Sequence, residues 1–227
     1  MDIIINNRYG TTLKTANKVC NEDIYITIDQ DLFEYDTSNE DGLLTRTLSY
    51  YFNDRITTLG DRVFQNYATE IELDFPYVES AGANCFYGST GVAKLNLPRL
   101  TSAGSNCFYQ MTKLKVLNLP SLNIIASNCC RYSSSLEVFC ATSITTIQSA
   151  ALADCTNLSM IIVGKNASLQ NVSAFIRTKI EDGTGFIYVP DEKIEEYKVA
   201  TNWSTFATQI KGWSEIPQEL REELKIW

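Results

Sequence analysis

The middle of the chain repeats itself every 22 residues. The stretch "AGANCFYGSTGVAKLNLPRLTS" (81–102) is followed directly by "AGSNCFYQMTKLKVLNLPSLNI" (103–124), and the same spacing extends without a gap to blocks at 59–80, 125–146 and 147–168. One such block is too short to bury its own apolar face, so neighbouring blocks must stack on one another. The period therefore predicts a solenoid in which each block forms one coil.

Each block carries a short run in which apolar residues alternate with other residues. In two blocks this run reads Leu95-Asn96-Leu97-Pro98 and Leu117-Asn118-Leu119-Pro120. A period of two is typical of a strand with one buried face, and proline ends the strand because it lacks the donor N–H. We expect the leucines to face the core and the residue between them to face outward.

Two further residue types, cysteine and asparagine, recur in register before the strand in three of the five blocks. We interpret the cysteines as small buried core residues, because no Cys-x-x-Cys pair occurs and three of them share one repeat position. The seven are Cys20, Cys85, Cys107, Cys129, Cys130, Cys140 and Cys155. Asn84, Asn106 and Asn128 form a second series. Asparagines at such positions bond the backbone of turns, and we favour this structural role over sugar binding.

The outward strand positions are the first candidates for recognition. We predict a binding face that combines them with tyrosines and an arginine at equivalent repeat positions, namely Glu72, Asp74, Lys94, Asn96, Asn118, Tyr87, Tyr109 and Arg131. The outward positions Val116, Val138 and Cys140 would continue the same face. The alternative is an ordinary solvated surface, because scattered polar residues need no functional explanation.

Composition excludes several classes of function. The formal net charge of -8 and the lack of a Lys/Arg cluster argue against nucleic-acid and anionic-membrane partners. The chain contains no histidine, phosphate-binding glycine loop or nucleophile elbow, so we expect no catalytic residues, no metal site and no cofactor.

The repeat resembles the BspA-type leucine-rich repeat family, on the Asn-Cys-Phe-Tyr segments, "LKVLNLPSL" and "CTNLSMIIV". The chain departs from the family pattern at Cys129-Cys130 and at Leu152, where the small-then-aromatic pair is absent. The run "YVPDEKIEEYKVATNWSTFATQIK" (188–211) is similar to the segment that often ends such arrays. The resemblance implies a mainly β repeat fold with a terminal strand-helix cap.

The N-terminal run "YGTTLKTANKVCNEDIYITI" (9–28) resembles a module of tail and baseplate proteins of phages that infect Gram-positive bacteria. In it, Ile24, Ile26 and Ile28 alternate as one strand. The first residues do not resemble a signal peptide, so we expect synthesis without export if Met1 is the natural start.

Together these features predict an α+β, mainly β chain built around a leucine-rich repeat solenoid. We expect a small N-terminal β module (1–30), an acidic connector with an N-terminal cap (31–58), the solenoid (59–185) and a C-terminal strand-helix cap with a tail (186–227). The tail "QELREELKIW" is predicted to be a short amphipathic helix that is mobile.

These resemblances imply a non-enzymatic virion protein of the tail, baseplate or fibre. Its N-terminal module would contact other virion proteins, and its repeat surface would bind a protein or glycan of the host surface. A homo-oligomer such as a trimer is a general expectation. The alternative is a bacterial surface adhesin of the same repeat family, and an enzyme is a third class that no motif supports.

Overall fold

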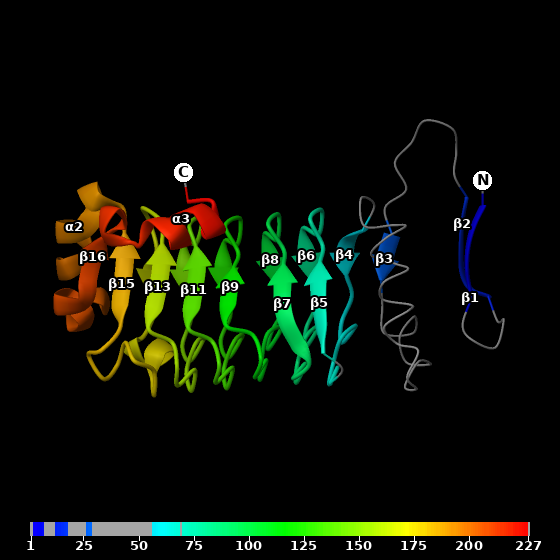
Figure 1. Cartoon of the computed structure of the whole chain (residues 1–227), viewed down its shortest axis with the longest axis horizontal. Coiled ribbons are helices and arrows are strands. Elements are labelled where there is room, and N and C mark those ends of the chain that lie inside the picture. Colours follow the sequence, from blue (N-terminus) through cyan, green and yellow to red (C-terminus); the bar gives the residue numbers. More distant parts are fainter. Residues whose placement is uncertain (1, 7–11, 18–25, 29–55, 69, 227) are drawn as a thin grey trace.

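The computed structural model describes residues 2–6, 12–17, 26–28, 56–68 and 70–226. Along the stack axis, two rows of short parallel strands lie one coil after another (Figure 1). The first row contains β5 (Ile71–Asp74), β7 (Val92–Asn96), β9 (Val116–Asn118), β11 (Val138–Ala141), β13 (Met160–Val163), β15 (Phe186–Val189) and β16 (Ile210–Gly212). The second row contains β3 (Ile26–Ile28), β4 (Ile56–Leu59), β6 (Ser80–Ala81), β8 (Ser102–Ala103), β10 (Ile124–Ile125), β12 (Thr146–Ile147) and β14 (Ser168–Leu169).

Both rows divide at the same place in the stack. In the first row β5 pairs with β7, and a second sheet runs β9-β11-β13-β15-β16. In the second row one sheet ends at β8 and another begins at β10. We call this boundary, between β7–β8 and β9–β10, the seam. It separates the two most similar repeats of the sequence.

The inward strand positions form a continuous core, as the alternation predicts. Leu97, Leu117 and Leu119 are fully buried, and Leu95 is nearly so. Phenylalanines of successive coils stack face to face, with 5.1 Å between the ring centroids of Phe64 and Phe86 and 5.7 Å between those of Phe86 and Phe108. Stacking the coils thus buries the apolar surface that a single coil leaves open.

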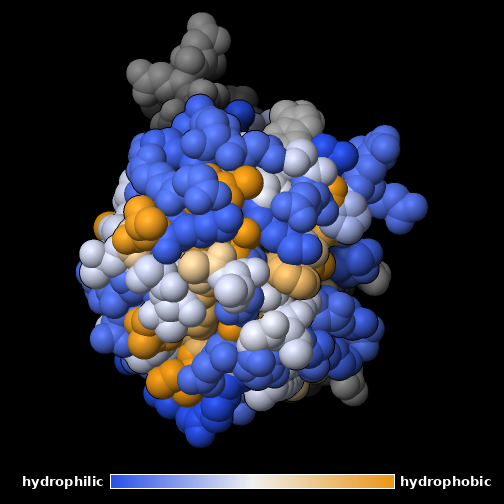
Figure 2. Space-filling view, turned by 90° about the vertical axis from the view of Figure 1, so that its left-hand side faces the viewer, coloured by the Kyte–Doolittle hydropathy of each residue, from blue (hydrophilic) through white to orange (hydrophobic). Residues whose placement is uncertain are grey.

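The C-terminal segments pack against the last coil. They comprise β15, the 3-10 helix η4 (Asp191–Lys193), α2 (Ile194–Val199), the 3-10 helix η5 (Trp203–Gln209) and β16. Tyr197 and Trp203 are buried, whereas Val199 is 81% exposed. Figure 2 shows the outer side of this end, where hydrophilic side chains surround smaller hydrophobic patches.

The N-terminal region contains an antiparallel pair, β1 (Asp2–Asn6) and β2 (Thr12–Asn17). The predicted strand at Ile26 and Ile28 is present as β3, which pairs in parallel with β4 and so joins the second row. Ile24, Cys20 and the acidic connector from 31 to 55 lie outside the described residues. The proposed domain boundaries therefore remain predictions.

The predicted tail helix is α3 (Gln218–Leu224), reached through the 3-10 helix η6 (Trp213–Glu215). The expectation that this tail is mobile is wrong for the described residues, because Ile216, Leu224 and Ile226 are buried against the outward side of the first row. In Figure 1, α3 crosses the row near β11 and β13.

A charge at an inward position of a central coil should unfold the stack. We expect Leu117→Asp to prevent cooperative folding, because the carboxylate would enter a fully buried apolar site. Thermal unfolding followed by circular dichroism checks this, with the exposed substitution Asn123→Asp as control. A Leu117→Asp protein that melts like the parent would contradict the inward assignment.

Tyr197 fastens the C-terminal segments to the array. Its hydroxyl donates to the Gly164 carbonyl oxygen at 2.6 Å and accepts from the Ala167 N–H at 2.8 Å. Burial raises the pKa of Tyr197 to about 12. Because an unfolded tyrosine ionises near ~10, the neutral phenol stabilises the fold below that pH, and this contribution is lost as the pH rises through about 12.

We therefore expect Tyr197→Phe to lower the free energy of unfolding at neutral pH by about 1–3 kcal/mol, since it leaves a buried N–H without its acceptor. The variant should also lose stability less steeply between pH ~10 and ~12. Urea unfolding at a series of pH values measures both effects. If the free energy of unfolding of the variant falls between pH ~10 and ~12 as steeply as that of the parent, Tyr197 does not contribute to the loss of stability at alkaline pH.

Candidate functional site

The turn segment that precedes each first-row strand links the coils by backbone hydrogen bonds. Alternate N–H groups of this segment donate to carbonyl groups of the next coil, as from Phe64 to Cys85 (2.7 Å), Phe86 to Cys107 (2.8 Å) and Phe108 to Cys129 (2.8 Å). The bonds from Asn84, Phe86 and Gly88 cross the seam, where the described strand sheets divide. The turn segments therefore form a ladder that continues through the seam.

In the turn segments before β5, β7, β9, β11 and β13, two residues have positive φ. The first series is Arg62, Asn84, Asn106, Asn128 and Ala150, and the second is Asn66, Gly88, Gln110, Tyr132 and Asp154. The three asparagines have φ between 54° and 59°, and asparagine tolerates this left-handed conformation better than most residues. The repeated asparagine thus has a backbone role, which favours the structural interpretation over sugar binding.

Tyrosine side chains form a row on the outside of the turn segments. The rings of Tyr87 and Tyr109 stack in parallel with centroids 4.7 Å apart, and Tyr132 meets Tyr109 edge-on at 5.4 Å. Burial and the neighbouring Tyr87 raise the pKa of Tyr109, so its hydroxyl stays protonated at neutral pH. We call Tyr87, Tyr109 and Tyr132 the tyrosine row.

Tyr132 is an unusual residue for its conformation. It has φ of 63°, where equivalent coils have Asn66, Gly88, Gln110 or Asp154, and its side chain is 40% exposed. A bulky side chain in the left-handed region costs energy, and such strain is concentrated at functional sites. Sequence analysis missed Tyr132, although it is the one aromatic residue at a repeat position that otherwise carries Asn66, Gly88, Gln110 and Asp154.

Arg131 holds the end of the tyrosine row in place. Its guanidinium lies over the Tyr132 ring, 4.8 Å from the centroid, and its Nε donates to Asp154 Oδ2 at 2.8 Å. Asp154 is buried and also pairs with Arg177. The predicted group of Tyr87, Tyr109 and Arg131 is therefore brought together by the structure.

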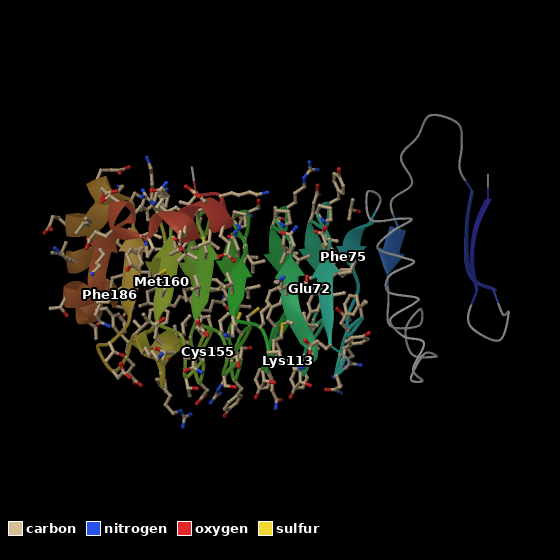
Figure 3. The ribbon with its side chains drawn as sticks, in the orientation of Figure 1. Glu72, Phe75, Lys113, Cys155, Met160 and Phe186 are labelled. Atoms are coloured by element: carbon tan, nitrogen blue, oxygen red, sulfur yellow. The ribbon has the colours of Figure 1, made fainter. Side chains whose placement is uncertain are left out.

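The predicted strand residues lie on a separate surface, the outward side of the first row. On β5 and β7, Glu72 pairs with Lys94 at 2.8 Å, and the Asn96 amide donates to Asp74 Oδ1 at 2.7 Å. All four side chains are exposed, and Figure 3 shows Glu72 on β5, beyond the strands that α3 crosses. We call these four residues the open outer face.

From β9 onward the outward side is covered, so the prediction of one continuous open face is wrong. Cys140, Ile162 and Tyr188 are buried beneath the C-terminal segment. Asn118 is half-buried, and its amide donates to the Leu224 carbonyl oxygen at 3.1 Å. At one outward repeat position, the first two coils carry Glu72 and Lys94, whereas the following coils carry Val116, Val138 and Met160. This change from charged to apolar residues was the sequence signal for the cover.

The cysteines behave as core residues. All six described cysteines, Cys85, Cys107, Cys129, Cys130, Cys140 and Cys155, are buried and unpaired with one another by disulfides. Burial raises the pKa of Cys140 and of Cys155 to about 12, which disfavours the thiolate that metal binding or nucleophilic attack requires.

Within the described ranges, no cluster of three or more His, Cys, Asp or Glu side chains could hold a metal ion. None of the helices in the same part of the chain has the length and hydrophobicity needed to cross a bilayer.

The backbone role of the asparagines can be tested at Asn106. Asn106→Val should destabilise the protein by about 1–2 kcal/mol, because a β-branched residue opposes positive φ, whereas Asn106→Gly should remain within about 0.5 kcal/mol of the parent. Urea denaturation compares the two variants. Equal losses for valine and glycine would show that the side chain, and not the conformation, is what matters.

Comparison with known proteins bears on the repeats. No curated protein shows significant similarity to the chain. The family profile described as the BspA type leucine rich repeat region matches in six copies, over residues 43–159 and 79–185. These matches cover more than half of the chain, and the parallel strand stack agrees with them. The chain therefore belongs to the BspA-type leucine-rich repeat family.

Proposed function

We propose that this chain is a non-enzymatic binding protein of a phage virion, placed in the tail, baseplate or an attachment fibre. The tyrosine row is its contact surface for a host-surface partner. The observation that carries the proposal is Tyr132, a partly exposed aromatic residue kept in a left-handed conformation beside Tyr109. Membership of a family of surface and protein-binding repeat proteins supports a binding role.

The geometry of the row favours a protein partner. Tyr87 and Tyr109 stack on each other, and Arg131 lies over Tyr132, so ring faces are largely used within the row. What remains outside are ring edges and hydroxyl groups. Tyrosines that are already ordered lose little side-chain entropy on binding and provide both apolar area and a hydrogen-bonding group.

The virion context rests on the resemblance of residues 9–28 to a module of phage tail and baseplate proteins. In this proposal the N-terminal module contacts other virion proteins, and the repeats face outward. A bacterial surface adhesin of the same family remains the alternative, since the family match supports both equally.

The chain offers a variant that separates binding from folding. Tyr132→Asn removes the ring but places a residue at positive φ that tolerates it, so the variant should be at least as stable as the parent. We expect it to bind intact Gram-positive host cells at least tenfold more weakly, in a cell-binding assay with fluorescently labelled full-length protein.

Tyr77→Asn is the matched control. Tyr77 is 37% exposed and lies under Arg99 at 4.8 Å, much as Tyr132 lies under Arg131, but it belongs to the segment after β5. The control should bind like the parent. Equal binding of host cells by the parent and Tyr132→Asn would refute the tyrosine row as the contact surface. Absence of the protein from purified phage particles, measured by mass spectrometry, would refute the virion assignment.

A further inference from the structure

The tyrosine row ends at a carboxylate that two arginines share. Asp154 occupies the repeat position of Tyr132 in the next coil, and only 7% of its surface is exposed. Arg131 Nε donates to Asp154 Oδ2 at 2.8 Å, and Arg177 Nε contacts Asp154 Oδ1. A buried carboxylate needs an opposite charge, but one guanidinium is enough to supply it. The group of Arg131, Asp154 and Arg177 therefore carries one positive charge in excess.

Arg177 is the less constrained of the two arginines. Arg131 also donates from Nη1 to Asn128 Oδ1 at 3.3 Å, and its guanidinium lies over the Tyr132 ring. The side chain of Arg177 is 62% exposed, and its two terminal nitrogens have no hydrogen-bond partner among the described residues. An ion pair as exposed as this adds little to stability. Asp154 thus holds the Nε of Arg177 and leaves its terminal N–H groups available to a ligand.

The backbone at Arg177 is in the left-handed region. Its φ is 56°, a conformation that asparagine and glycine tolerate better than arginine. Tyr132 shows the same combination of a long side chain and positive φ. The turn ladder places these two residues one coil after and one coil before Asp154. Strain of this kind is concentrated at binding sites, so it marks both residues on this surface.

The charges around Arg177 favour a single carboxylate as its ligand. Two parallel N–H groups of a guanidinium match the two oxygens of a carboxylate. Glu181 accepts from the Arg177 backbone N–H at 2.6 Å, and no ion pair joins it to a guanidinium in the described part of the chain. The whole chain has a formal net charge of -8, which repels a polymer of many negative charges. One excess positive charge instead suits one acidic side chain of a protein.

We propose that Arg177 and Arg131 form a carboxylate-binding site at the end of the tyrosine row, which receives an aspartate or glutamate side chain of a host-surface protein. Arg177 makes the paired hydrogen bonds, and Arg131 adds charge and keeps Tyr132 in place. Asp154 fixes both guanidinium groups before binding, which reduces the entropy lost when the partner docks. The inference rests on the proposed function, because it names the chemistry of the partner of the tyrosine row.

Arg177→Gln tests the site in the cell-binding assay with fluorescently labelled full-length protein. The variant loses the terminal N–H pair and the charge, while Arg131 still neutralises Asp154, so its urea unfolding should match that of the parent. We expect it to bind intact host cells about tenfold more weakly. Arg99→Gln makes the same charge change at the exposed arginine over Tyr77 and should bind like the parent.

Salt dependence separates binding by Arg177 from a structural role. Binding by the parent should weaken between ~0.1 M and ~1 M NaCl, because the Debye length falls from ~10 Å to ~3 Å, and Arg177→Gln should lose most of this dependence. Arg177→Lys keeps the charge but cannot make the paired hydrogen bonds, so its affinity should lie between those of the parent and Arg177→Gln. Parental salt dependence in Arg177→Gln, or parental affinity in Arg177→Lys, would overturn the site.

Protease treatment of the cells identifies the source of the carboxylate. Removal of surface proteins should abolish the binding that depends on Arg177. Binding that survives protease and still depends on Arg177 would overturn the acidic protein in favour of an anionic polymer. If Tyr132→Asn weakens binding and Arg177→Gln does not, the carboxylate site is wrong while the tyrosine row stands. If neither substitution weakens binding, the tyrosine row is wrong as well.

Discussion

The hydrogen-bond ladder of the turn segments is the constraint on which the rest of the stack depends. Each segment must direct alternate N–H groups toward the next coil, and it does so with two left-handed residues in every turn. These positions explain why asparagine and glycine recur there, and the hydrogen bonds of the ladder continue where the strand sheets divide. The stacked phenylalanines and the tyrosine row follow from the same register, because they project from this segment.

Much of this fold could be predicted from the sequence. The alternation in "LNLP" assigns the inward leucines, which are buried, and the strand expected in the C-terminal strand-helix cap is present as β15. The asparagine series was expected to bond the turn backbone through its side chains, whereas the structure shows positive φ at these positions and a side-chain bond from Asn106 to Asn84. Positive φ was not foreseen, because a single asparagine is compatible with many turns. The pairing of β3 with β4 depends on partners 30 residues apart in irregular sequence, which periodicity does not reveal.

The candidate site was predicted less completely. Sequence registers show which residues share a row, and so they correctly placed Tyr87, Tyr109 and Arg131 together. They do not show what covers a row. Asn118 was expected beside Asn96 on an open face, yet a helix more than a hundred residues later in the chain reaches it. The outer side of the stack is consequently divided into a polar part that is open and an apolar part that the chain covers itself.

Amide hydrogen exchange across the seam tests the central claim most directly. If the turn ladder joins the two halves, the amides of Asn84, Phe86 and Gly88 should exchange as slowly as those of Phe64 and Phe108, which donate between coils on either side. All of them would then open only with the whole stack. Fast exchange confined to Asn84, Phe86 and Gly88 would contradict the account, since it would mean that the stack opens at the seam and that the ladder does not hold its two halves together.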